Sequence, residues 1–391
     1  MSVPPVRSLT TALPDPDPDA LAHSQRLVER IRAELERSGG WIPFHRYMEL
    51  ALYAPGLGYY ASGATKLGAA GDFITAPEMT PLFGRTLARF AVPVLAQSGG
   101  DVLELGAGSG RLAVDLLLEL EALGCLPGRY RILEVSPDLC QRQRQLIGQQ
   151  AAHLLSRVEW LDRLPESCAG LVIANEVLDA MPVHLIHWSD GVPQERGVIW
   201  SGNGFAWRDR PIAEAALAGE VAALPVTGDY LSEICPAAPA LVTSLAGCLT
   251  LGLLLFIDYG FPRAEYYHPQ RHMGTLKVHY RHRSLDDPFF LPGLADITAH
   301  VDFSAAALAG TAAGLELSGY TSQANFLMDA GILDLMLAME PTSPAYLRAA
   351  SAAQQLLQPM EMGELFKVLA LGKGMPDDLP GFRRGDRRSA L

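Results

Sequence analysis

Three glycines at alternate positions give the first sign of chemistry in this chain. Gly106, Gly108 and Gly110 directly follow an apolar stretch that carries one acid, Glu104, and a leucine-rich stretch begins after Arg111. Glycine tolerates positive φ and has no Cβ, so a ligand can lie against bare backbone in such a turn. The helix expected after the turn would offer free N–H groups at its start. The pattern predicts a strand, a nucleotide-binding turn and a helix, although a tight turn without a ligand remains open on this stretch alone.

The spacing of these glycines narrows the class of ligand. Dinucleotide-binding domains carry Gly-x-Gly-x-x-Gly, whereas here the third glycine comes one residue early, so a dehydrogenase is the least favoured alternative. The early glycine, with an acid two residues before the first one, is typical of Rossmann-like methyltransferases that use S-adenosylmethionine (SAM). We expect the three glycines to hold the amino-acid part of SAM, with Glu104 orienting it.

Two further acids follow later strand-like stretches. Glu134 lies thirty residues after Glu104, where a carboxylate can accept hydrogen bonds from both ribose hydroxyls of a nucleoside cofactor. The alternative for Glu134 is an ordinary charge near the start of a helix. Asp162, after the third strand-like stretch, could accept a hydrogen bond from the adenine amino group, and a surface charge explains it equally well.

The segment from Asn175 to Asp179 places three polar side chains where an apolar stretch ends. A surface turn is one explanation, and a catalytic site is the other. Methyl transfer from a sulfonium needs an aligned nucleophile and a group that handles its proton. Glu176 and Asp179 would suit a guanidinium, which carboxylates bind through charge-assisted, bidentate hydrogen bonds. A carboxylate pair would also localise the guanidinium charge on one nitrogen and leave the other more nucleophilic. We expect Asn175, Glu176 and Asp179 to form the catalytic segment.

Strand-like and helix-like stretches alternate through the middle of the chain, which predicts an α/β fold with a mostly parallel sheet and ligands at the carboxyl ends of its strands. The expected strands are 102–105, 130–135, 158–161, 170–174 and 251–257, and helices are expected at 112–123 and 137–151. Further helices are expected at 20–38, 44–52, 81–97, 304–314, 324–339 and 343–357. Stretches 315–322 and 366–372 are expected to pair as closing strands.

We therefore predict a Rossmann-like class I methyltransferase sheet with a helical N-terminal region, a β-rich insertion and a loop insertion. The hairpin turns Asp190-Gly191 and Asn203-Gly204 indicate the β-rich insertion. The expected divisions are a disordered lead (1–19), N-terminal helices and a lid loop (20–97), the first part of the core (98–186), the β-rich insertion (187–240), a core strand (241–260), a substrate-side insertion (261–303), C-terminal helices and closing strands (304–375) and a tail (376–391).

Composition limits the partners of the chain. It has 391 residues, is 49% hydrophobic and carries a net charge of −12, which argues against non-specific binding to nucleic acid. Its five cysteines form no Cys-x-x-Cys pair, as expected in a reducing compartment. The acidic, proline-rich start resembles neither a signal peptide nor a transit peptide, and the longest apolar run, 249–257, is far short of the ~20 residues of a membrane span. We expect a soluble, cytoplasmic protein of bacterial type.

Four histidines at 268, 272, 279 and 282 have spacings that a metal site could use. No acid or cysteine constellation accompanies them, and their segment has the character of a loop. We expect them to face solvent or substrate, and we expect no metal.

A long stretch, 53–84, is rich in glycine and has few periodic apolar residues, but it carries the aromatic residues Tyr53, Tyr59, Tyr60, Phe73 and Phe83. Loops of this length in compact proteins tend to be lids or binding segments. A linker is the alternative, although linkers seldom carry such aromatic anchors. We expect a lid.

With these segments assembled, the chain resembles the MidA-like family of class I methyltransferases. The stretches that carry the resemblance include Gly71 to Glu78, Glu104 to Gly110, Asn175-Glu176 with Asp179 to Val183, Asp258 to Gly260, and Asp296 to Phe303. They extend from about residue 40 to 375. The Gly-Asp-Phe-Ile-Thr-Ala-Pro stretch is the most specific, because few other methyltransferases contain it. The acidic N-terminus departs from the targeting segment of the mitochondrial member.

The resemblance implies SAM as cofactor, an arginine of a partner protein as methyl acceptor, and a possible homodimer. It implies that the 53–84 loop covers the cofactor, with Gly71, Asp72, Phe73 and Thr75 completing the pocket. The family's mitochondrial member assists assembly of respiratory complex I, so an assembly-like role is implied too. We therefore expect a protein arginine methyltransferase. The alternatives are a small-molecule methyltransferase and a non-catalytic assembly chaperone that keeps the SAM-binding fold.

Overall fold

The chain is organised around one mixed β-sheet. The structure is a computed structural model that describes residues 16–61 and 75–391. In spatial order the strands are β15 (Glu316–Ser322), β16 (Phe366–Lys373), β10 (Leu249–Phe261), β5 (Cys168–Asn175), β2 (Asp101–Leu105), β3 (Tyr130–Leu133) and β4 (Val158–Leu161), and β14 (Val301–Asp302) pairs with the end of β10. The five strands from β10 to β4 are parallel, and β16 runs antiparallel between β10 and β15. The predicted parallel sheet and the predicted closing strand pair are both confirmed.

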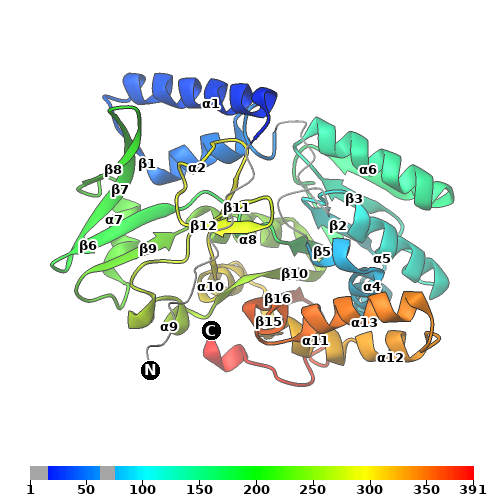
Figure 1. Ribbon diagram of the computed structural model, residues 1–391. Coiled ribbons are helices and arrows are strands. Elements are labelled where there is room, and N and C mark those ends of the chain that lie inside the picture. Colours follow the sequence, from blue (N-terminus) through cyan, green and yellow to red (C-terminus); the bar gives the residue numbers. More distant parts are fainter. Residues whose placement is uncertain (1–15, 62–74) are drawn as a thin grey trace, which may run out of the picture.

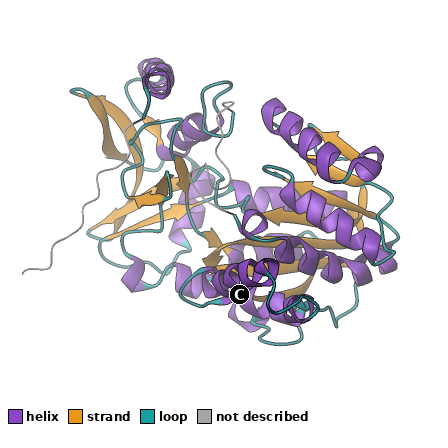
Figure 2. Cartoon of the chain, turned by 45° about the vertical axis from the view of Figure 1, so that its right-hand side comes forward, coloured by secondary structure: helices purple, strands orange, loops and turns teal. Residues whose placement is uncertain are grey.

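Successive apolar side chains of the central strands point to opposite faces of the sheet, so they contribute to two hydrophobic cores, one on each face. On β5, for example, Ile173 belongs to one core and Val172 to the other. The first core is covered by helices α4 (Pro81–Ser98), α5 (Arg111–Ala122), α6 (Pro137–Gln150), α11 (Gln323–Asp329), α12 (Ile332–Leu337) and α13 (Pro344–Leu357). The second is covered by α8 (Ala237–Cys248) and α10 (Phe303–Ala312). Figure 2 shows helices on both sides of this sheet.

A second body lies beside the carboxyl ends of the central strands, on the left of Figure 1. Its antiparallel sheet has the order β1 (Ile42–Pro43), β7 (Val192–Ser201), β6 (His184–Ser189) and β9 (Tyr230–Ile234), with β8 (Gly204–Arg210) paired to β7. Helices α1 (Pro18–Arg37), α2 (Phe44–Tyr53) and α7 (Ala215–Ala222) pack on it. Both predicted hairpins are present. Asp190-Gly191 joins β6 to β7 as predicted, whereas the turn between β7 and β8 is Gly202-Asn203, one residue earlier than predicted, because Gly204 already pairs with Ser201.

The segment after β10 is more ordered than its sequence indicates. We predicted a loop there, but it contains α9 (Arg263–Tyr266), a 3-10 turn (Pro269–Arg271) and a small antiparallel sheet of β12 (Arg283–Leu285), β11 (Lys277–Tyr280) and β13 (Asp296–Thr298). Strands of three or four residues are too short to show a clear alternation. They are stabilised by pairing across the segment, so the loop prediction was wrong at these residues.

Two element boundaries also differ from the prediction. Stretch 324–339 is two helices, because Gly331 adopts φ +97° between them. Strand β10 continues past Asp258 to Phe261, since its last residues pair with β14 after its pairing with β5 ends at Ile257. Short helices complete the chain: α3 (Ala76–Met79), α14 (Met362–Leu365) and 3-10 turns at Ala152–Arg157 and Arg388–Ala390.

No helix within residues 16–61 and 75–391 is both long and apolar enough to cross a membrane. The divisions of the chain given above stay a prediction, because the two bodies share a long interface and their segments interleave along the sequence.

Candidate active site

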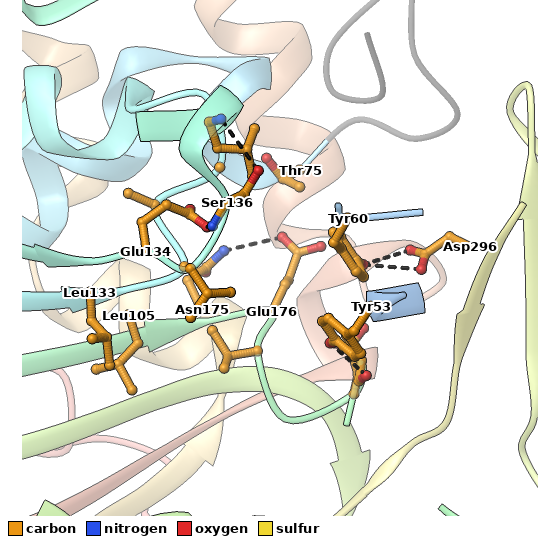
Figure 3. Close-up of a pocket in the computed structure, with 18 of the residues that line it drawn as sticks. Tyr53, Tyr60, Thr75, Leu105, Leu133, Glu134, Ser136, Asn175, Glu176 and Asp296 are labelled. Carbon is orange, nitrogen blue, oxygen red and sulfur yellow. Dashed lines mark hydrogen bonds between the residues drawn. The ribbon is translucent and has the colours of Figure 1, made fainter. Parts of the chain in front are cut away.

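A cavity of about 950 Å³ opens at the carboxyl ends of the central strands. Figure 3 shows Asn175 and Glu176 between two groups of side chains: Glu134 and Ser136 on one side, and Tyr53, Tyr60 and Asp296 on the other. The central sheet supplies the first group, and the second body and the small sheet supply the second. A single cavity therefore joins the predicted cofactor residues to the predicted catalytic residues.

The glycine turn lies on the cofactor side of the cavity. Gly106, Gly108 and Gly110 have φ of +62°, +52° and +89°, which favours glycine at all three positions. The N–H of Gly106 donates to the carbonyl of Leu133 at 3.0 Å, so the turn stays attached to β3 as it leaves the sheet. Helix α5 begins directly after Gly110 and directs its first N–H groups toward this turn.

Glu134 is held by two hydrogen bonds next to the turn. Its Oε1 accepts from the N–H of Ser136 at 2.9 Å, and its Oε2 accepts from Nε2 of Gln143 at 3.0 Å. Burial raises the pKa of Glu134, although these bonds act in the opposite direction. An ionised carboxylate has about four acceptor sites, so both oxygens can still accept from a ribose.

Gln143 links these parts and was not singled out from the sequence. Its Nε2 also donates to the carbonyl of Gly108 at 2.9 Å, and its Oε1 accepts from Nε1 of Trp160 at 2.9 Å. A Cβ on Gly110 would lie 3.2 Å from Gln143, so the glycine and the glutamine fit each other closely. Nothing in its own sequence stretch distinguishes Gln143 from the other glutamines of α6.

Glu104 lines the cavity from below the turn and is almost fully buried. The hydroxyl of Tyr130 donates to its Oε2 at 2.7 Å. Burial raises the pKa of Glu104 to about 7, with the Tyr130 bond acting in the opposite direction. Glu104 is thus a fixed acceptor behind the glycine turn, a position that agrees with the predicted orienting role.

The other predicted cofactor residues have different surroundings. Thr75 lines the cavity at the start of α3. Asp162 lines a second, smaller cavity that adjoins Glu134, but its side chain is 93% exposed and lies 3.8 Å from Arg163, so its adenine role stays a prediction. Gly71, Asp72 and Phe73 lie outside the described residues, and their lid role stays a prediction as well.

The turn after β5 is strained and tightly held. Asn175 ends the strand, and Glu176 follows with φ +54°, an unusual conformation for a residue with a side chain. Asp258 on β10 holds this turn, because its Oδ2 accepts from the N–H groups of Val177, Leu178 and Asp179 at 3.2, 2.8 and 3.3 Å. The sequence marked Asp258 only as a polar residue near a strand end.

Two acceptor atoms of this turn have no partner. Asn175 Oδ1 and Asp179 Oδ1 are buried and make no hydrogen bond within the described part of the chain. The Nδ2 of Asn175 donates to Glu176 Oε1 at 3.2 Å. Buried acceptors are seldom left unpaired, because each one lost from water costs free energy. Asn175 and Asp179 both line the cavity.

Three carboxyl groups lie close together in this part of the cavity, and the pKa of each is raised. Burial, and then the nearby Asp258, raises the pKa of Glu176 to about 8. Burial followed by Asp258 and Glu176 also raises the pKa of Asp179 far above its usual range. Burial raises the pKa of Asp258 to about 7 despite its backbone hydrogen bonds. A cationic ligand would favour the ionised form of all three groups.

Tyrosines and one more acid close the far side of the cavity. The hydroxyl of Tyr53 donates to the carbonyl of Ala180 at 2.9 Å, and that of Tyr60 donates to both carboxylate oxygens of Asp296 at 3.0 Å. Asp296 belongs to β13 of the small sheet. The sequence identified Tyr53 and Tyr60 as anchors of a loop and Asp296 only within a family stretch. None of the three was predicted as a site residue.

The four histidines of the substrate-side insertion differ in their surroundings. His268, His272 and His282 are exposed, and His279 lines the cavity. They are not brought together, and the described residues hold no metal-type cluster that includes them.

Comparison with known proteins decides the class of this site. The sequence model of a family described as "Putative S-adenosyl-L-methionine-dependent methyltransferase" matches residues 86–321. The chain belongs to this family. It is a SAM-dependent methyltransferase with a class I fold, and SAM is its cofactor.

Solved structures of this class are closely similar. A COG1565 superfamily member from Burkholderia thailandensis, bound to S-adenosyl-homocysteine, is 50% identical, has a TM-score of 0.94, and matches 97% of this chain and 100% of its own. A second Burkholderia thailandensis protein of that superfamily, solved without a ligand named, is 49% identical with a TM-score of 0.91 over the same shares.

Two curated relatives are more distant. The protein arginine methyltransferase NDUFAF7 homolog of Drosophila melanogaster mitochondria is 29% identical over 89% of this chain and 85% of its own length. Human mitochondrial protein arginine methyltransferase NDUFAF7 is 28% identical over 86% of this chain and 81% of its own.

The residues of the methyltransferase fit SAM on structural grounds. The positive-φ glycines leave backbone bare on one wall, and the Glu134 oxygens retain acceptor capacity beside it. When bound, SAM supplies a methyl group on a sulfonium that can be transferred by in-line displacement. Glu176 and Asp179 line another part of the same cavity.

Proposed function

We propose that this methyltransferase transfers the methyl group to a guanidinium nitrogen of an arginine in a partner protein. The observation that carries the proposal is the unpaired, buried Oδ1 of Asp179 within a group of carboxyls. A guanidinium offers five N–H donors and a permanent charge, which match both the missing donors and the excess of acids.

The role of each acid follows from its contacts. Glu176 and Asp179 would bind the guanidinium nitrogens, and Asn175 Oδ1 would accept from the same group. Asp258 accepts hydrogen bonds from three backbone N–H groups of the turn and from the N–H of Tyr259, so we infer that it positions the other acids rather than binding the substrate. With the guanidinium present, its charge lowers the pKa of the acids and keeps them ionised.

Proton balance gives these acids a second task. Attack by a guanidinium nitrogen on the methyl carbon forms an N–C bond, breaks the bond from that carbon to the sulfonium sulfur and releases S-adenosyl-homocysteine. The attacking nitrogen is then left with one proton more than the methylated product holds. A carboxylate of the pair would accept this proton and release it to solvent when the product leaves. The acid side of the cavity thus serves both binding and proton removal.

The names of the curated relatives support an arginine acceptor, and both name a protein arginine methyltransferase. Their identity to this chain is below 30%, so the acceptor requires its own experiment. An assembly-like role, a cytoplasmic location and a homodimer stay predictions from the sequence.

The test uses purified protein, methyl-labelled SAM and an extract of cells that lack this chain. We expect label in a protein band, and methylated arginine after hydrolysis of that band. Glu176→Gln and Asp179→Asn should lose labelling by at least ~100-fold and still bind SAM. Asp286→Asn is the control, since Asp286 is an exposed acid of the neighbouring small sheet.

Other outcomes select other functions. Label confined to the low-mass fraction would identify a small-molecule methyltransferase and overturn the proposal. A third outcome is that the unmodified protein labels nothing, while Glu176→Gln and Asp179→Asn still support assembly of a partner protein. That outcome would identify a non-catalytic chaperone. Labelled lysine or histidine in the protein band would place the acceptor in another class.

A further inference from the structure

A cluster of two histidines and one glutamate lies outside the methyltransfer cavity. It consists of His45 on α2, His184 at the start of β6, and Glu195 on β7. One nitrogen or carboxylate oxygen from each residue lies within 4.8 Å of the corresponding atoms of the other two. In the described part of the chain, it is the one group of three or more such residues with this proximity. None of the three lines the cavity, and the methyltransfer reaction leaves all of them unused.

The contacts of the cluster leave one nitrogen unsatisfied. His184 Nδ1 lies 2.7 Å from Glu195 Oε1, and both side chains are buried. His45 Nδ1 is also shielded from solvent and has no hydrogen-bond partner. A hydrogen-bonded histidine–glutamate pair would account for the burial of His184 and Glu195, but it does not account for the buried His45 Nδ1 that has no partner among the described residues.

The ligand atoms of the cluster suit a cation. Two imidazole nitrogens and a carboxylate oxygen lie within 4.8 Å of one another, and the side chains of His184 and Glu195 are buried. Arg46, next to His45 in the chain, lies 3.0 Å from Glu34 and 2.7 Å from Glu49, so its charge is balanced.

We propose that His45, His184 and Glu195 bind a divalent transition metal, with zinc as the representative ion. Two imidazoles and a carboxylate form a ligand set that zinc accepts, with a water in the fourth position. Tetrahedral bonds of about 2.1 Å place ligand atoms roughly 3.4 Å apart. The ligand atoms here lie within 4.8 Å of one another, so they have to rearrange to bind the metal.

The rearrangement has a defined direction. The two rings now lie against each other at a tilt, with centroids 3.9 Å apart and planes inclined by 32°. An imidazole binds a metal in its own plane, so one ring has to turn. His184 is fixed by Glu195, whereas His45 is partly exposed and has an unpaired Nδ1, so His45 is the ring that turns.

A metal here would connect the cluster to the acceptor side of the cavity. Helix α2 ends at Tyr53, which donates to the carbonyl of Ala180, and β6 begins at His184 four residues later. Helix α2 is already linked to Ala180 through Tyr53. A metal bound by His45 and His184 would link the same helix to residue 184 as well, so both ends of the segment 180–184 would be held against α2. The expected role is structural, so its signature is stability as well as ion binding.

The experiment titrates Co²⁺, and separately Zn²⁺, into metal-free protein that carries no polyhistidine tag. We expect one ion per chain, visible absorption bands typical of low-coordinate Co²⁺, and a rise in Tm of about 3 °C or more at saturating Zn²⁺. His45→Gln and Glu195→Gln should weaken Co²⁺ binding at least ~10-fold. His153→Gln should not, because His153 forms an exposed pair with Glu121 and has no third ligand.

Two results would overturn the proposal. One is the absence of saturable binding by the unmodified protein. The other is binding that His45→Gln retains at full strength, which would place the ion elsewhere. Circular dichroism and binding of S-adenosyl-homocysteine, measured on each variant, show whether it is folded, so a misfolded variant is not counted as loss of the site.

Discussion

The cofactor side and the acceptor side of the cavity are built in different ways. The cofactor side consists of residues from 104 to 143, which are two strands, one turn and two helix starts in direct succession. The proposed acceptor side brings together side chains from three separate parts of the chain: Tyr53 and Tyr60, Glu176 and Asp179, and Asp296. The first uses backbone geometry and satisfied hydrogen bonds, whereas the second uses crowded acids with unpaired acceptors.

This difference suits two tasks: binding a cofactor that many enzymes share, and selecting one particular methyl acceptor. A backbone turn recognises whatever fits against it, so it suits a cofactor shared by many enzymes. Side chains held by distant segments can change one at a time, so they suit an acceptor that differs between enzymes. The following predictions test whether the two sides are energetically separate.

The largest effect is expected at the glycine turn. In Gly106→Val, a β-branched residue would have to adopt φ +62° next to Val177, so we expect SAM binding to fall at least ~100-fold. Calorimetry with SAM measures it. Gly124→Val is the matched control, because Gly124 has φ +67° with open space around it. Equal loss of SAM binding in both variants would show that backbone strain alone, and not the cofactor site, is responsible.

The next effect is expected at Asp258. In Asp258→Asn the new amide presents donors to the N–H groups of the catalytic turn, so we expect kcat to fall by ~10–100-fold. The Kd of SAM should change less than threefold. Steady-state kinetics and calorimetry measure the two quantities. A large loss of SAM affinity would break the separation between the two sides.

The pH dependence of the reaction should come from the acceptor side. Glu176 is neutral below its raised pKa of about 8 and ionised above it. Because a guanidinium binds the ionised form, kcat/KM should rise as pH increases toward about 8 and then level off. In Glu176→Gln the remaining activity should depend less steeply on pH over that range. A rate that falls with rising pH in the unmodified enzyme would contradict this assignment.

The smallest effect is expected at Tyr60. Tyr60→Phe removes the hydroxyl that donates to Asp296, so KM for the acceptor should rise by ~3–10-fold with the Kd of SAM unchanged. Tyr47→Phe is the control, because its buried hydroxyl donates to Pro288 in the same body but outside the cavity. Tyr47→Phe should lower Tm without changing KM. Equal changes of KM in both would assign the effect to stability.

The sequence predicted the central sheet and the glycine turn well because their signals are local. The glycine spacing, the acid after each strand and the alternation of strands with helices all occur within short windows, and the central sheet follows from them. Gln143 was missed since its role depends on a fold that brings α6 against Gly108 and Glu134.

The acceptor side could be predicted only in part. The three-residue strand that carries Asp296 is too short for a periodic signal, so its segment was predicted as a loop. Asp258 acts through backbone groups some eighty residues earlier, and no pattern in the sequence links the two. His45, His184 and Glu195 meet for the same reason, through packing between α2 and the insertion sheet.

The continuity of the cavity has a consequence for inhibitor chemistry. Glu134 and Asp296 line the same cavity. We therefore expect that one compound joining an adenosine to a guanidine through a short linker could contact both groups of residues at once. Such a compound would combine the affinity of the glycine turn for the cofactor part with that of the acids for the guanidine.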